Sequence, residues 1–200
     1  MVDQPPSNAS DSLGSPAMAG PSFQQAMEIT AQWLALWEQG ELSDEVLADR
    51  VAELVVSRDG ARGFFVVSLA GDSPLMDRMP DALVMQLRAA GEGVVDLSAR
   101  NLAMSTAMAL HHGRSGDGDQ QAASERVQSR CRDLLRHLEP SAVKLRLESL
   151  LAAAQGRAGD QQEAPPWGDD GAFLERWGYD AQQKEAIAEA ILAVADGEQP

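Results

Sequence analysis

Apolar residues recur at helical intervals along most of this chain, from about residue 23 to residue 195. The clearest example comes after Ser43, where apolar residues at i, i+4, i+7 and i+8 share one helix face: Leu47, Val51, Leu54 and Val55. Such repeats predict helices over 23–39, 43–58, 80–90, 94–112, 124–138, 140–155, 169–177 and 180–195, with a glycine-rich loop over 113–121. The pattern therefore predicts an all-α protein, mainly one compact multi-helix domain.

One segment fits a strand almost as well as a helix. Residues 63–70 read GFFVVSLA, and their β-branched and aromatic content favours a strand. A single strand needs a partner, however, and only Val94 and Val95 offer a thin candidate. A short buried helix explains the run equally well, and the helical surroundings favour it. We expect at most one short strand pair around 63–70.

Composition divides the chain into four parts. Residues 1–22 are rich in Pro, Ser, Gly and Ala and hold few large apolar groups, so we expect a disordered tail there. Residues 23–155 form the predicted helical core domain. Residues 156–168 read GRAGDQQEAPPWG, which is typical of a linker, and residues 169–196 follow as a linked C-terminal helical hairpin.

The charge balance is strongly acidic, with a net charge of -15 and a pI near 4.4. Nucleic acids and anionic membrane surfaces carry the same sign, so we expect neither as a partner. No apolar run reaches the ~18 residues of a membrane span. The lone cysteine, Cys131, excludes an internal disulfide framework and suits a reducing compartment, so we expect a cytoplasmic protein.

Reactive side chains are few, and none falls into a recognised catalytic or metal-binding spacing. The sequence therefore assigns no catalytic residue, no metal ligand and no cofactor, and an enzyme is the less favoured reading. One stripe of the 94–112 helix is the exception, because polar Asn101 and His111 share its apolar face with two methionines. The stripe consists of Asn101, Met104, Met108 and His111. Methionines at this spacing usually fill a core. Alternatively, these four residues line a small-molecule pocket.

Aromatic residues concentrate near the C-terminus. Four of the nine in the chain stand within 167–179: Trp167, Phe173, Trp177 and Tyr179. Large amphipathic aromatics after a linker either pack back onto the core or form an anchor patch for another protein. We interpret these four as candidate partner-binding residues.

The stretch between Arg114 and Arg146 is the one part of the chain that is not acidic. It contains three further candidate partner-binding residues: Arg126, Arg130 and Arg136. A solvated face of mixed charge is the simplest interpretation. The alternative is a docking surface for an acidic partner, including the acidic C-terminal hairpin of this chain itself.

Four stretches carry a resemblance to a known family: ALWEQGELSDEVLADRVAELV, RDGARGFFVVSL, NLAMSTAMALHH and FLERWGYD. Together they resemble a family of small uncharacterised acidic helical proteins from cyanobacteria, over roughly residues 30–195. The resemblance implies a cytoplasmic prokaryotic setting and carries over no activity and no site residues.

Three functions remain open at this point. The leading hypothesis is a non-enzymatic protein–protein interaction or regulatory module that binds an unknown protein partner. The second is a small-molecule-binding protein or enzyme with its pocket on the 94–112 helix. The third is a homo-oligomeric structural protein that associates with itself.

Overall fold

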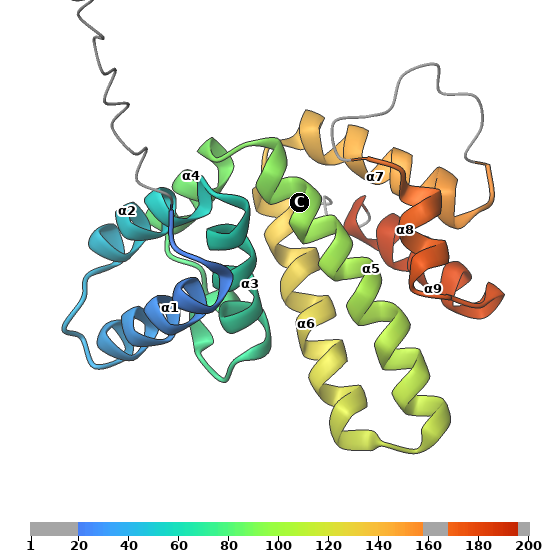
Figure 1. Cartoon of the computed structure of the whole chain (residues 1–200), viewed down its shortest axis with the longest axis horizontal. Coiled ribbons are helices and arrows are strands. Elements are labelled where there is room, and N and C mark those ends of the chain that lie inside the picture. Colours follow the sequence, from blue (N-terminus) through green and yellow to red (C-terminus); the bar gives the residue numbers. More distant parts are fainter. Residues whose placement is uncertain (1–19, 158–167, 196–200) are drawn as a thin grey trace, which may run out of the picture.

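The computed structural model describes residues 20–157 and 168–195, and every regular element in those two stretches is helical (Figure 1). The expected all-α fold is confirmed. Residues 63–70 lie within a helix, and the described stretches contain no strand. Most of the expected tail, most of the expected linker and residues 196–200 lie outside the described residues.

The first half of the chain folds into a lobe of short helices that we call the N-terminal lobe. Serine caps begin its first three helices, because Ser22, Ser43 and Ser57 each accept a hydrogen bond from a backbone N–H of the first turn. The elements are α1 (Phe23–Glu38), α2 (Asp44–Val55), α3 (Arg58–Ala70), the 3-10 helix η1 (Pro74–Asp77) and α4 (Asp81–Ala89).

The contact between α1 and α3 explains the ambiguous segment. A Cβ atom at Gly63 would lie 2.5 Å from the Cβ of Ala26, so only glycine permits this close crossing. Phe64 and Phe65 then enter the core with almost no exposed surface. The aromatic pair that favours a strand in the sequence is therefore buried by a helix, whereas Val66 of the same segment is 47% exposed.

The second half forms the C-terminal lobe around two long antiparallel helices. These two helices meet at Gly116, whose φ of +74° is the left-handed conformation that glycine adopts freely. Helix α9 lies against α5 and also contacts α6 and α7 (Figure 1). The elements are α5 (Glu92–Ser115), α6 (Gly118–His137), α7 (Pro140–Ala154), α8 (Asp170–Arg176) and α9 (Ala181–Ala195).

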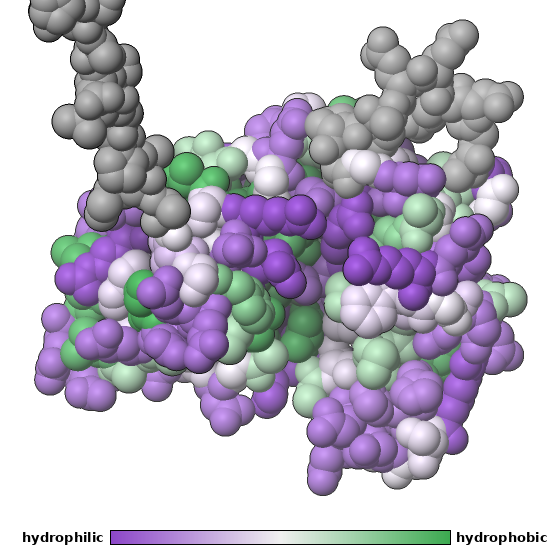
Figure 2. All heavy atoms as spheres, viewed as in Figure 1, coloured by the Kyte–Doolittle hydropathy of each residue, from purple (hydrophilic) through white to green (hydrophobic). Residues whose placement is uncertain are grey.

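One continuous cluster of buried apolar side chains runs through both lobes, from Ala26 in α1 to Val194 in α9. Hydrophilic residues cover most of the face shown in Figure 2, and a group of hydrophobic residues is visible where the two lobes meet. The C-terminal hairpin, α8 and α9, contributes Leu174 and Ile187 to this common core.

Candidate docking groove

The stripe predicted on the 94–112 helix lies on α5. Asn101 and Met104 are half-buried, whereas Met108 and His111 are exposed. Across the described residues, no three side chains among His, Cys, Asp and Glu lie close enough together to hold a metal ion. None of the helices in these stretches combines the length and the apolarity that crossing a membrane requires.

Cys131 points into the core from α6 and has no exposed surface. Burial raises the pKa of its thiol well above the usual range, because a thiolate would lose its hydration there. A thiol held in the neutral form is a weak nucleophile.

Arg130 is buried rather than displayed, with 3% of its surface exposed. Its guanidinium donates two hydrogen bonds of 2.7 and 2.6 Å to the carboxylate of Asp77. It also donates to the carbonyl oxygens of Leu69, Gly71 and Ser73 at 2.8, 2.7 and 3.0 Å. The arginine thus binds the end of α3 and η1 to α6, and it holds the pKa of Asp77 below its usual range.

Arg126 is the more exposed neighbour of Arg130 on α6. Its guanidinium lies 3.7 Å from the carboxylate of Asp72, which is itself almost fully exposed. An ion pair of this kind contributes little to stability. Arg126 is therefore accessible to a partner in this structure, whereas Arg130 is not.

Three other arginines of the 114–146 stretch hold the C-terminal hairpin. Arg114 donates to Asp180 at 2.6 Å and lowers the pKa of that carboxyl. Arg136 donates to the carbonyl oxygens of Ala193 and Val194, at 2.7 and 3.1 Å. The third arginine, Arg146 of α7, pairs with the carboxylate of Asp170 at the start of α8. This stretch therefore makes the contact with the protein's own acidic hairpin that the sequence left open as an alternative.

The C-terminal aromatics separate into different environments. Phe173 and Tyr179 are buried, and the guanidinium of Arg100 lies 4.6 Å from the ring centre of Phe173. Burial also raises the pKa of Tyr179 to about 12. Trp177 is 53% exposed, and Trp167 lies outside the described residues. Of the three described aromatics, only Trp177 presents a large apolar surface to solvent.

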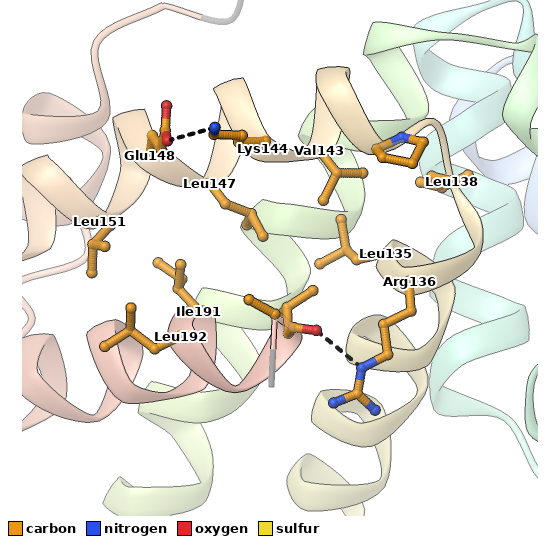
Figure 3. Close-up of a pocket in the computed structure, with 13 residues that line it drawn as sticks. Leu135, Arg136, Leu138, Val143, Lys144, Leu147, Glu148, Leu151, Ile191 and Leu192 are labelled. Atoms are coloured by element: carbon orange, nitrogen blue, oxygen red, sulfur yellow. Dashed lines mark hydrogen bonds and ion pairs between the residues drawn. The ribbon is translucent and has the colours of Figure 1, made fainter. Parts of the chain in front are cut away.

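A groove of about 470 Å³ lies between α6, α7 and α9 (Figure 3). Its buried floor is apolar and comes from all three helices, and polar side chains are confined to Arg136, Lys144 and Glu148. Leu192 of α9 and Leu151 of α7 stand at its more exposed side. The floor residues are Leu135, Leu138, Val143, Leu147, Ile191 and Val194.

Local sequence explains why these three helices leave a groove. Pro140 starts α7 only three residues after α6 ends at His137, so the two helices diverge from a tight corner. Helix α9 approaches from the other side, and Arg136 binds two carbonyl groups of its last described turn. Residues of α7 at i, i+4 and i+8 lie along the groove in one row: Val143 and Leu147 of the floor, then Leu151 at the more exposed side.

None of the groove residues except Arg136 was a sequence-predicted site residue. The four residues of the α5 stripe do not line it, nor do Phe173, Trp177, Tyr179, Arg126 or Arg130. The apolar repeat along α7 was visible in the sequence, but such a repeat normally indicates core. One signal in the sequence could have indicated the groove. The apolar face of α7 is wide and extends to Leu151, next to the charged pair Lys144 and Glu148.

Comparison of the sequence with models of protein families gives a match that covers most of the chain. The model of the family described as "Uncharacterised conserved protein UCP020893" matches residues 22–194. The chain belongs to this family. The UCP020893 match starts at the cap of α1 and ends one residue before the end of α9, so it spans both lobes and the hairpin. No curated protein and no solved structure matches the chain.

Proposed function

We propose that this protein is a non-enzymatic protein-interaction module, and that its partner inserts the apolar face of a helix into the groove between α6, α7 and α9. The groove itself is the observation that carries this proposal. An apolar floor with polar groups confined to the sides suits an amphipathic helix, which anchors itself by side chains at i, i+3, i+4 and i+7.

The contacts that the buried charged side chains make also favour a binding function over a catalytic one. An enzyme gathers several polar groups that converge on one reacting atom. In the described residues, the buried arginines and aspartate are occupied in holding helices together: Arg130 binds α3 and η1, and Arg146 binds Asp170. The groove receives no buried charge of this kind, so its chemistry is that of apolar contact.

A small apolar ligand is the second candidate occupant. The groove volume of about 470 Å³ lies inside the range of about 300–1,000 Å³ in which small-molecule sites fall. A small-molecule site would then lie in the groove between α6, α7 and α9, not at the predicted stripe on α5. Self-association is the third candidate function. Val56 and Met85 expose most of their apolar surface, and exposed apolar surface can form a contact between two copies of the chain.

We also propose a cyanobacterial origin and a cytoplasmic location. The resemblance described above supports the origin. The single, buried cysteine supports a compartment in which thiols stay reduced. Fractionation of the native host with an antibody to this protein would test the location, and recovery in the periplasm or membrane fraction would refute it.

Two leucines of similar exposure allow a matched test of the groove. Leu192 is 51% exposed and lines the groove, whereas Leu145 is 57% exposed on α7 and does not line it. Leu192→Gln removes apolar contact area without adding charge, and Leu145→Gln makes the same change outside the groove. Both side chains are exposed enough that the fold should tolerate either substitution.

The experiment is affinity capture from native-host extract with the wild type and both variants, quantified by mass spectrometry. We expect one protein to bind the wild type and Leu145→Gln in comparable amounts and to bind Leu192→Gln about tenfold more weakly, as the loss of half a buried leucine implies. A partner retained equally by both variants would refute the groove as its docking site, and so would the absence of any enriched protein.

A further inference from the structure

The solvent-facing side of α9 carries an acidic stripe that leads to the groove. Glu185, Glu189 and Leu192 stand at i, i+4 and i+7, so their side chains follow one another along one face of the helix. All three are exposed, and Leu192 lines the groove at the end of this stripe. A helix seated against Leu192 would therefore run beside both carboxylates.

These two carboxylates have no cationic partner in the part of the chain that the structure describes. Among the described residues, neither Glu185 nor Glu189 takes part in an ion pair, and Lys184 is the one cation on α9. On the opposite wall Glu148 meets Lys144 at 4.0 Å, with both side chains mostly exposed. Arg136, the other cation of the groove, is occupied by the carbonyl groups of Ala193 and Val194.

The overall charge of the chain also favours a basic partner. The net charge of -15 favours encounter with a positively charged partner. The apolar floor and the acidic stripe of Glu185 and Glu189 together favour a ligand that has one apolar face and one basic face.

We infer that the occupant of the groove is a basic amphipathic helix of another protein. Its apolar residues would contact Leu147, Ile191 and Leu192, and its Lys or Arg residues would face Glu185 and Glu189. Flanking charge of this kind mainly sets the rate of encounter and the choice of partner, whereas apolar contact supplies the affinity. This inference rests on the proposed function, because it names the partner chemistry for the same groove.

Two synthetic peptides of about 18 residues test the charge requirement, a length sufficient for a helix that is stabilised by contact. Both repeat leucine at one helical face; the other face is lysine in the first peptide and glutamate in the second. Fluorescence anisotropy measures the dissociation constant of each. A peptide of the first composition with scrambled order controls for non-specific attraction to an acidic protein.

We expect the leucine–lysine helix to bind at least about tenfold more tightly than the leucine–glutamate helix and the scrambled peptide. The double variant Glu185→Gln/Glu189→Gln should weaken it about fivefold, as two partly exposed ion pairs imply. The double variant Glu38→Gln/Glu41→Gln makes the same change of net charge in the N-terminal lobe and should weaken it less than about twofold.

The possible failures can be told apart. If both helical peptides bind with similar affinity and Leu192→Gln weakens both, the groove binds helices but the basic partner is refuted. Binding that Leu192→Gln leaves unchanged would refute the docking groove and this inference together. Light scattering that shows a dimer dissociated by Leu192→Gln would replace the basic helix by a second copy of this chain.

Discussion

The guanidinium of Arg146 and the carboxylate of Asp170 form two parallel hydrogen bonds of 2.8 Å each. The pair joins α7 to the start of α8, with only 1% and 3% of the two side chains exposed. Ser149 donates a further 2.9 Å bond to Asp170, and Asp96 of α5 accepts a 2.8 Å bond from Arg146. A buried charge is tolerated only with such partners, so this network fixes where the hairpin docks.

Asp170→Asn should destabilise the protein strongly. The substitution removes the charge that Arg146 is paired with, and breaking one side of a buried pair costs about 3 kcal/mol or more. Chemical denaturation would measure the free energy of unfolding. Asp59→Asn is the matched control, because Asp59 pairs with Arg62 at 3.5 Å on the exposed surface and its loss should cost about 0.5 kcal/mol or less. Equal effects of the two substitutions would contradict the structural role of Asp170.

Arg130→Lys should weaken the joint between the two lobes. A lysine keeps the charge but cannot donate to Asp77 and to the carbonyl oxygens of Leu69 and Gly71 at once, because it lacks the planar guanidinium. Buried carbonyl groups left without donors predict a loss of about 2 kcal/mol or more in the free energy of unfolding.

The control for this substitution is Arg126→Lys, one turn earlier on α6. The 3.7 Å pair of Arg126 with Asp72 is exposed, so its replacement should leave the unfolding free energy within about 0.5 kcal/mol. Denaturant titrations of the two variants under the same conditions give the comparison. An Arg130→Lys variant as stable as Arg126→Lys would show that water replaces the lost donors.

Local signals were sufficient for most of the fold. Apolar periodicity predicted both ends of α1 and the start of α2 to within one residue, because this signal acts over a few residues. Helix α2 ends at Val55, three residues before the expected end. The loop predicted over 113–121 is shorter in the structure, where Asp117 caps α6 and its first turn is polar. Polar residues at an exposed helix end resemble a loop in sequence, so this boundary could not be placed.

The groove and the hairpin contacts could not be predicted for a different reason. Asp170 looks like any acidic residue in a first helical turn, and its partner lies 24 positions away. Likewise, Leu151 and Leu192 look like core residues, and only the packing of three helices decides which apolar positions stay uncovered. Such information is tertiary and leaves no local pattern in the sequence.

Truncation after Arg157 should destabilise the remaining chain. The linker-like composition of 156–168 predicts a separable hairpin, but α8 and α9 bury Phe173, Leu174 and Ile187 in the common core. Each such side chain contributes about 1.5–3 kcal/mol when fully buried, against a total stability of about 5–15 kcal/mol. We therefore expect loss of near-ultraviolet circular dichroism and binding of an apolar dye.

Addition of a separate peptide that covers 168–195 provides the control for this truncation. If the exposed core is the cause, the peptide should restore the near-ultraviolet signal in a saturable manner. A truncated protein that unfolds cooperatively within a few degrees of the full chain would instead show that the hairpin is separable, as composition alone suggests.

Stability at high pH should depend on Tyr179. Burial raises its pKa from 10.0 to about 12, so the unfolded chain releases this proton at lower pH than the folded chain does. The protonated phenol therefore contributes its full stabilisation below about pH 10, and this contribution is lost as the pH rises to about 12. Because Tyr179 is the one tyrosine of the sequence, tyrosinate absorbance follows its ionisation directly.

Tyr179→Phe provides the comparison, since phenylalanine keeps the ring and cannot ionise. The variant should lose less stability than the wild type between pH 10 and pH 12 in denaturant titrations. Cys131 contributes a separate decline that begins nearer pH 9, because burial raises its pKa as well, and this decline should be common to both proteins. Parallel stability curves for the two proteins above pH 10, or a tyrosinate titration centred at pH 10, would show that the phenol is not desolvated.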